Sequence, residues 1–260
     1  NAVTTQWFSI DLAGRSEPDW SALDADGVQV LARARHGRKL RRGGLRGNRF
    51  GLVVRELEGE RRELESRLRR IAEGGVPNYF GEQRFGREGS NLIAAQALLG
   101  GERRERHRHK RGLYLSAARS YLFNTALSYR VARGDWCHAV PGEVLLPADG
   151  ESAFVADEPD AGIAAQVERG ALRPTGPLWG RGRSPARGEA LALEQSALSD
   201  LSDWCEGLEF VGLKQERRPL VLPVRELNWR FTDERTLELN FTLPPGGYAT
   251  TVLRELILPR

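Results

Sequence analysis

Apolar and polar positions alternate near the end of the chain, which is the pattern of a half-buried strand. Apolar residues recur at every second position from Leu237 to Leu243, with polar residues between them. Successive side chains of a strand point to opposite faces of a sheet, so this spacing predicts a strand over 236–243. A second strand is predicted over 227–231, and the chain closes with a turn and a short helix.

The first third of the chain shows the same preference for strands. Residues 2–12 and 28–34 are rich in β-branched and aromatic residues, and both are predicted to be strands, as is 49–57. Between 60 and 72 the period changes, and Leu64, Leu68 and Ile71 fall on one face of a predicted amphipathic helix. Further helices are predicted over 91–99, where Ser90 is the expected N-cap, and over 113–133.

The middle of the chain has shorter segments and more proline and glycine. We interpret residues 104–222 as an inserted lobe between 1–103 and 223–260. Within it we predict short strands near 140–146, 152–155 and 209–213, and helices near 160–169 and 189–202. The run 173–188 is rich in Pro and Gly, and no helix or strand is predicted there.

Length and composition narrow the class of protein. The chain has 260 residues, of which 40% are hydrophobic, so it forms one large domain or two small ones around a packed core. No apolar run approaches the ~18 residues of a membrane span, and we expect a soluble, cytoplasmic protein. Cys137 and Cys205 lie far apart and are expected to be reduced, buried thiols.

The stretch Val76–Asn91 has an unusual composition. It combines three aromatic residues with glycines, two arginines and amide side chains. Aromatic planes beside Arg and amide donors are what proteins use to hold an unstacked nucleobase. The alternative is a glycine-rich loop whose aromatics fill the core, and composition alone does not separate the two.

Basic residues are concentrated in two runs. The net charge is +4, and Arg35–Arg46 is the densest run, predicted to form a loop between strands. Such a run is either a solvated face or a surface that follows phosphates. In the second run, Arg103–Arg111, a solvated or RNA-facing pair is favoured over a metal site for His107 and His109, because no third ligand is in reach.

Familiar catalytic motifs are absent from the sequence. It contains no G-x-S-x-G, no H-E-x-x-H and no phosphate-binding loop. His138 beside Cys137 is expected to be structural. Asp11 and Glu82 are only weak carboxylate candidates.

Several ordered stretches resemble one family. V-P-N-Y-F-G-E-Q-R-F-G at 76–86 is similar to the signature of the tRNA pseudouridine synthase D family, TruD. The segment R-H-G-R-K-L-R-R-G-G-L-R-G-N-R-F at 35–50 also resembles that family. L-S-A-A-R-S-Y-L-F-N at 115–124 and G-Y-A-T-T-V-L-R-E-L at 247–256 match two further family segments.

The resemblance implies a cofactor-free reaction on tRNA. The family isomerises uridine at tRNA position 13 to pseudouridine, with a nucleophilic aspartate and a flipped base held on an aromatic ring. Ala2, Thr4 and Gln6 match the tail of the family's G-x-K-D-x-x-A-x-T-x-Q motif. The aspartate would therefore stand two residues before Asn1. The sequence also contains no Met, and we interpret it as N-terminally truncated and inactive by itself.

The resemblance also assigns roles to residues of this chain. Asn78 is expected to hydrogen-bond the target nucleotide or orient the aspartate, and Phe80 is expected to stack on the uracil. Tyr248 replaces a family Phe near the substrate. Phosphate contacts are expected from Arg35, His36, Arg38 and Lys39, and supporting roles from Gln6, Arg84, Arg254 and Glu255.

The implied fold is α+β, with a pseudouridine synthase-like, mainly antiparallel sheet, flanking helices and an inserted α/β lobe. The expected partner is tRNA, with no metal, cofactor, membrane or protein partner. Two other hypotheses stand beside it: a non-catalytic RNA-binding fragment, and a scaffold that binds no RNA and shows little salt dependence of tRNA binding.

Overall fold

The computed structural model describes residues 3–20, 28–37, 44–150 and 152–257, and divides the chain into two units, Asn1–Arg46 and Gly47–Arg260. In the first unit, the described parts of the segments predicted as strands, 3–12 and 28–34, do not form strands. Those two predictions are therefore wrong for the described residues. Suitable composition does not make a strand unless a neighbouring strand lies alongside.

The second unit contains a three-stranded antiparallel sheet in the order β1-β9-β8. Its strands are β1 (Asn48–Val54), β8 (Arg225–Asp233) and β9 (Thr236–Leu243), so the strands predicted over 49–57, 227–231 and 236–243 are confirmed. The register pairs Phe50 with Phe241, whose rings stack with centroids 5.5 Å apart. Two segments almost 200 residues apart in sequence are thus neighbours in the sheet.

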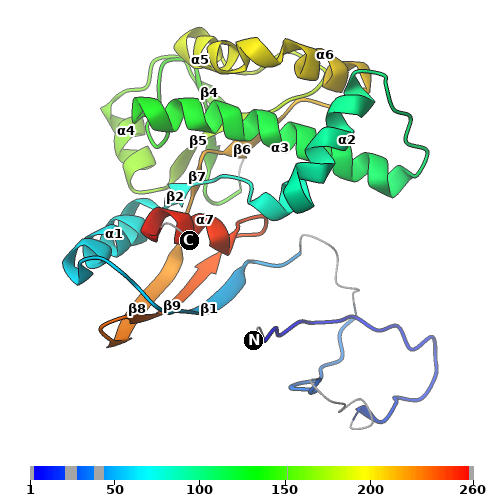
Figure 1. Ribbon diagram of the computed structural model, residues 1–260, viewed down its shortest axis with the longest axis vertical. Helices are drawn as coiled ribbons and strands as arrows, with labels where there is room; N and C mark the ends of the chain where they lie inside the picture. Colours follow the sequence, from blue (N-terminus) through cyan, green and yellow to red (C-terminus); the bar gives the residue numbers. More distant parts are fainter. Residues whose placement is uncertain (1–2, 21–27, 38–43, 151, 258–260) are drawn as a thin grey trace. The chain divides into compact units, whose positions relative to one another are not determined.

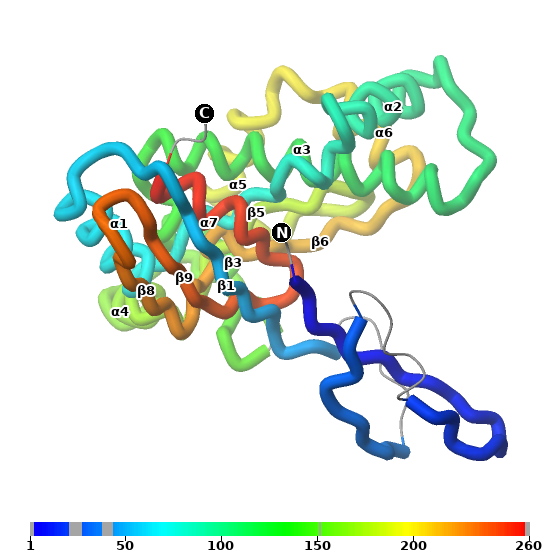
Figure 2. The backbone as a smooth tube through the Cα atoms, turned by 60° about the horizontal axis from the view of Figure 1, so that its bottom comes forward, coloured from blue at the N-terminus to red at the C-terminus, as the bar shows by residue number. Residues whose placement is uncertain are grey.

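Two helices, α1 (Arg61–Gly74) and α7 (Ala249–Leu256), cover one face of this sheet (Figures 1 and 2). The alternating apolar residues of β9 point at them, and Leu68 of α1 and Val252 of α7 are fully buried in the same cluster. The helical spacing of α1 and the strand spacing of β9 therefore meet in one core.

The two-stranded ladder of β2 (Val76–Pro77) and β7 (Val221–Leu222) leads to a second sheet. That sheet has the order β4-β3-β5-β6 and is antiparallel throughout. Its strands are β3 (Glu143–Pro147), β4 (Phe154–Ala156), β5 (Leu172–Leu178) and β6 (Glu216–Pro219).

Helices surround this second sheet, and the longest, α3 (Arg108–Arg133), runs along it (Figure 1). The others are α2 (Ser90–Leu99), α4 (Ala161–Glu168), α5 (Gly188–Leu198) and α6 (Ser202–Phe210). Helices combined with antiparallel sheets confirm the predicted α+β class. No helix in the described part of the chain is long and apolar enough to cross a membrane.

In the middle of the chain, one predicted strand is wrong and one strand was not predicted. Residues 209–213 do not form a strand, because α6 continues to Phe210. The Pro-rich run 173–188 contains most of β5. This strand pairs with β3 at residues 172–174 and with β6 at residues 175–178. Each proline of β5 therefore lies where only one side of the strand is in a ladder, which is where a residue without an N–H is tolerated.

The start of α4 gives a testable local contribution to stability. Oδ1 of Asp160 accepts a hydrogen bond of 2.8 Å from the backbone N–H of Ile163. Asp160→Ala should lower the free energy of unfolding by about 1 kcal/mol in a urea titration, since a helix N-terminal donor loses its acceptor. Glu158→Ala, an exposed carboxylate two residues earlier, is the control, and an equal loss in both variants would contradict the capping role.

Candidate functional site

The stretch Val76–Asn91 is held in place at its start by the β2–β7 ladder. Gly75 has φ +73°, and a Cβ there would lie 2.5 Å from the carbonyl oxygen of Leu222, so only glycine allows this approach. Immediately after β2, the backbone N–H of Asn78 donates to the Leu220 carbonyl at 2.8 Å. The chain therefore enters the site in a fixed direction.

The Asn78 side chain is buried and its amide is oriented by two contacts. Nδ2 donates to the Pro219 carbonyl at 2.8 Å, and Oδ1 accepts from Nη2 of Arg218 at 2.6 Å. Only the second Nδ2 hydrogen is left for another acceptor. Asn78 thus links the loop to β6, and one N–H donor and one lone pair of Oδ1 are left for a nucleotide.

Phe80 lies at the centre of a small aromatic cluster. Its backbone N–H donates to Oδ1 of Asn124 at 2.9 Å, and its carbonyl accepts from Nδ2 of the same amide at 3.0 Å. Its ring packs edge-on against Phe123, with centroids 5.6 Å apart, and 6.3 Å from the ring of Tyr248. The two readings of this stretch, core aromatic and base platform, therefore apply to the same residue, which is only 7% exposed.

Two guanidinium groups lie over the Phe80 ring. The Cζ atom of Arg218 is 4.0 Å from the ring centroid, and that of Arg84 is 5.1 Å from it. Burial lowers the pKa of Arg218 to about 10, and the charge of Arg84 acts in the same direction. Arg218 is still protonated at neutral pH, so the site is cationic.

Tyr248 and α7 close the far side of the loop. A Cβ on Gly81 would lie 2.9 Å from Cδ1 of Tyr248, so the tyrosine ring packs directly on the glycine backbone. The Thr251 hydroxyl donates to the Tyr79 carbonyl at 3.3 Å, and Cζ of Arg254 lies 5.4 Å from the Tyr79 ring centroid. The structure therefore brings together four of the predicted residues, Asn78, Phe80, Arg84 and Tyr248. Arg254 contacts Tyr79 rather than Phe80.

Other predicted residues lie elsewhere. Glu255 lines a separate cleft, and burial raises its pKa, with the charge of Arg254 opposing the shift. Gln6, Arg35 and His36 belong to the first unit; Arg35 forms an ion pair of 2.8 Å with Glu17, and His36 contacts Ser9. Arg38 and Lys39 lie outside the described residues.

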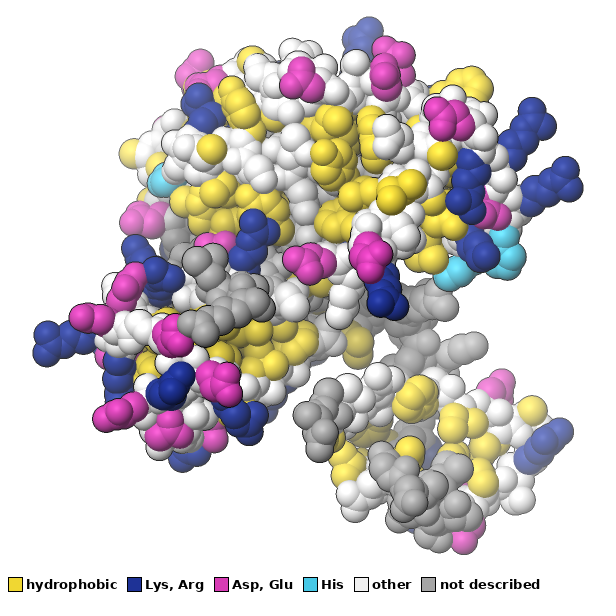
Figure 3. Space-filling view, in the orientation of Figure 1, with side chains coloured by type: hydrophobic (Ala, Val, Ile, Leu, Met, Phe, Trp, Pro, Cys, Tyr) yellow, Lys and Arg dark blue, Asp and Glu magenta, His cyan; other side chains and the backbone are white. Residues whose placement is uncertain are grey.

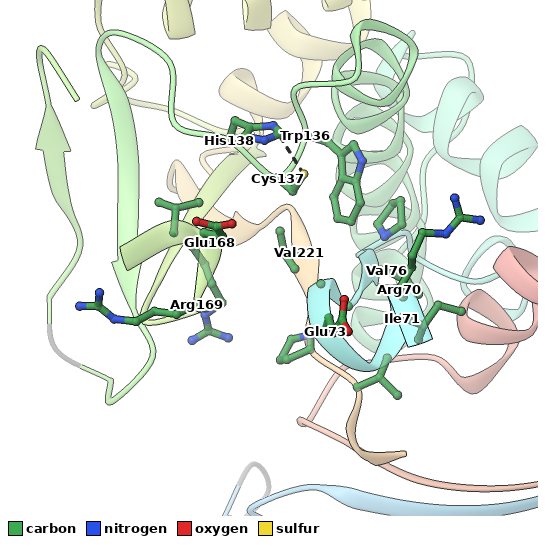
Figure 4. A pocket seen from close by; sticks show the side chains of 18 of the residues that line it. Arg70, Ile71, Glu73, Val76, Trp136, Cys137, His138, Glu168, Arg169 and Val221 are labelled. Carbon is green, nitrogen blue, oxygen red and sulfur yellow. Dashed lines mark hydrogen bonds between the residues drawn. The ribbon is translucent and has the colours of Figure 1, made fainter. Parts of the chain in front are cut away.

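The separate cleft has a volume of about 1320 Å³. It is lined by α1, β2, α4 and the turn that follows α3 (Figure 4). Glu73 and Glu168 lie on opposite walls, below Cys137, whose Sγ is 3.6 Å from Nδ1 of His138. Burial raises the pKa of the Cys137 thiol, which makes it a poor nucleophile. We place the candidate site at Phe80, where aromatic, amide and cationic groups converge, and not in this cleft.

The second basic run is a surface feature. Its arginines and histidines are exposed, and these side chains gather over the start of α3 in the space-filling view (Figure 3). This agrees with the solvated or RNA-facing interpretation of His107 and His109. Cζ of Arg103 also lies 5.2 Å from the Tyr114 ring centroid, so part of the run packs on the helix.

Sequence reasoning missed Arg218, which contacts both Asn78 and Phe80. A signal was present in the adjacent pair Arg217–Arg218, since neighbouring residues of a strand face opposite sides and one arginine of the pair had to point inward. In β6 both find partners, with Arg217 on Glu194 at 2.6 Å and Arg218 on Asn78. Which partner each would take was not readable from the sequence.

Comparisons with known proteins agree on one family. The sequence model described as tRNA pseudouridine synthase D (TruD) matches residues 1–109 and 104–256. The chain is 49% identical over 259 residues to the tRNA pseudouridine synthase D of Nitrosococcus oceani, covering 99% of this chain and 72% of that protein. It is also 49% identical over 257 residues to that of Methylococcus capsulatus, covering 99% and 73%.

A solved structure shows the same fold. A Methanosarcina mazei protein, provisionally designated tRNA pseudouridine synthase D, superposes with a TM-score of 0.64 at 24% identity, covering 88% of this chain and 72% of that one. The family match extends over nearly the whole sequence and includes every element that builds the Phe80 cluster. The chain therefore belongs to the tRNA pseudouridine synthase D family.

Proposed function

We propose that this chain supplies the base-holding part of a tRNA pseudouridine synthase, which isomerises uridine at tRNA position 13 to pseudouridine in the cytoplasm without a cofactor. The observation that carries this proposal is the cluster of Asn78, Phe80 and Tyr248, fixed by α3, β6 and α7, in a chain of this family.

The reaction requires a base to leave its stack, lose the N-glycosidic bond, rotate and re-attach through C5. A pocket for it must hold a planar ring through that rotation, and the rings of Phe80 and Tyr248 provide apolar walls for this. The Phe80 ring is covered by Arg218, so a base that stacks on it takes the place of that guanidinium. The remaining Nδ2 hydrogen of Asn78 is a donor suited to a uracil oxygen or to the carboxylate nucleophile.

Ala2, Thr4 and Gln6 match the tail of the family's G-x-K-D-x-x-A-x-T-x-Q motif. By this match, the nucleophile would be an aspartate two positions before Asn1. Attack on the base or the sugar needs such a carboxylate, and no other group near Phe80 in the described residues replaces it.

Further residues complete the proposal. Arg35, His36, Arg38 and Lys39 are assigned to backbone phosphates of the tRNA, and Gln6, Arg254 and Glu255 to supporting contacts. The division into catalytic parts 1–103 and 223–260 and an inserted lobe 104–222 is supported by the two separate sheets, one built by β1, β9 and β8 and the other by β3 to β6.

A single comparison tests the function. Unmodified tRNA is incubated with the 260-residue chain and with a chain extended upstream through the aspartate, and pseudouridine at position 13 is quantified. We expect product from the extended chain, and none after Asp→Asn at the nucleophile. Product from the 260-residue chain would refute the upstream nucleophile, and none from a folded extended chain would leave an RNA-binding protein without catalysis.

A further inference from the structure

The charges around Phe80 are not balanced within the second unit. Arg84 and Arg218 both lie over the ring, and neither forms an ion pair with a carboxylate of the described residues. No carboxylate is among the groups that shift the pKa of Arg218, which burial and the charge of Arg84 lower and Tyr248 raises. Most other partly buried arginines of the unit are paired, as Arg119, Arg130 and Arg217 are with Glu216, Glu143 and Glu194.

The hydrogen-bond donors of the two side chains are only partly used. Nη2 of Arg218 donates to Oδ1 of Asn78 at 2.6 Å and to the Gly246 carbonyl at 3.1 Å, both neutral acceptors. Nε of Arg84 is buried and has no partner. A buried donor without a partner destabilises the fold, so an acceptor at this place would stabilise the site.

The residue beside the Arg218 guanidinium is a glycine, Gly246. Gly246 has φ +82°, a conformation that glycine adopts freely, and a Cβ there would lie 3.5 Å from Nη1 of Arg218. The residue next to this guanidinium therefore carries no side chain that competes for its donors.

We propose that Arg84 and Arg218 together bind one phosphate group of the RNA backbone, next to the nucleotide whose base is held at Phe80. Planar guanidinium forks match phosphate oxygens. A phosphate would also offset the positive charge of the two arginines, which their present neutral acceptors do not. A base stacked on Phe80 displaces the guanidinium over the ring, and the adjoining phosphate offers it new acceptors. This inference rests on the proposed function, since it takes the anion from the tRNA substrate.

The salt dependence of tRNA binding tests the proposal, because the slope of log affinity against log salt counts neutralised phosphates. Arg84→Met/Arg218→Met should lower that slope by about 0.7–0.9, the value for one phosphate, and weaken binding at about 0.1 M salt five- to eight-fold. Arg84→Lys/Arg218→Lys keeps both charges and should keep the wild-type slope. Arg69→Met/Arg230→Met removes the same charge from exposed positions on α1 and β8, and should also leave the slope unchanged.

The outcomes separate the claims. An unchanged slope in the double Met variant, or an equal loss in the exposed control, overturns the phosphate site. Another outcome is that the double Met substitution leaves the slope unchanged and yet abolishes pseudouridine formation when it is made in the extended chain. In that case the two arginines act on the upstream carboxylate instead, and the proposal is also overturned. If Arg218→Met does not fold, Arg84→Met alone is measured, because Arg84 is partly exposed. A wild-type slope in Arg84→Met counts against the site.

The proposed function and the phosphate site can fail independently. A lowered slope with no pseudouridine from the extended chain would support the phosphate site and refute the enzyme. Pseudouridine from the extended chain, together with an unchanged slope in the double Met variant, would support the enzyme and refute the phosphate site.

Discussion

Replacing Arg130 with methionine is expected to lower the free energy of unfolding by about 3–5 kcal/mol, the largest single effect we expect in this chain. The side chain of Arg130, in α3, is 7% exposed and contacts the side chain of Glu143, in β3, which is 1% exposed, at 2.9 Å. It also donates to Oδ1 of Asp135 at 2.6 Å and to the His138 carbonyl at 3.0 Å. Without it, the carboxylates of Glu143 and Asp135 and the backbone carbonyls of Asp135 and His138 lose a donor.

The charges of this network show why removal of one partner is severe. Burial disfavours the charge of Arg130, but Glu143 and Asp135 more than offset that, so its pKa is raised above the ordinary value. Glu143 is already imperfectly satisfied, since its Oε1 has no partner in the described residues. Methionine keeps most of the volume and removes all of the donors, so the loss reports electrostatics and hydrogen bonding rather than a cavity.

Urea denaturation followed by circular dichroism measures this effect. Arg133→Met is the matched control, because Arg133 lies less than one helical turn away, also bonds Asp135, and is 43% exposed. Exposed ion pairs contribute about 0–1 kcal/mol, so the control should lose no more than that. Equal losses in the two variants would mean that the buried network adds nothing beyond a surface pair.

Replacing Phe80 with leucine in the extended chain should lower kcat/KM for tRNA about five- to 150-fold, which corresponds to the 1–3 kcal/mol of a base–aromatic stack. Leucine is the informative replacement. Alanine would also remove core volume, and Phe→Ala changes in cores cost about 3–5 kcal/mol of stability. Phe80 is buried against Phe123, so the alanine variant would mix lost folding with lost binding.

Phe241→Leu supplies the control for Phe80→Leu. Phe241 is fully buried, its ring stacks on Phe50 with centroids 5.5 Å apart, and it lies in the β1-β9-β8 sheet, outside the candidate site. Both substitutions remove an aromatic contact worth about 0.5–1.5 kcal/mol of stability, but only Phe80→Leu removes the proposed platform. Wild-type kcat/KM in Phe80→Leu, or an equal loss in both variants, would rule out base stacking on Phe80.

The sequence determined those elements whose signals are local. The alternation of Leu237 to Leu243 made β9 predictable, and the 3–4 spacing of Leu64, Leu68 and Ile71 did the same for α1, because each period selects one buried face. The sequence also predicted that Asn78 and Phe80 belong to a site, but through the family motif that lies over them, because the composition of Val76–Asn91 alone fits a core-filling loop equally well.

Only the tertiary structure decided what these residues contact. Partner choice depends on segments far apart in the chain, and no local period encodes it: Asn78 meets Arg218 across 140 positions, and Phe80 is clamped by Asn124. The same holds for β5, which carries two prolines and forms only because β3 and β6 pair with different halves of it. The segments 2–12 and 28–34 show the reverse case, in which suitable strand composition forms no strand in the described residues, because a strand exists only through its neighbour.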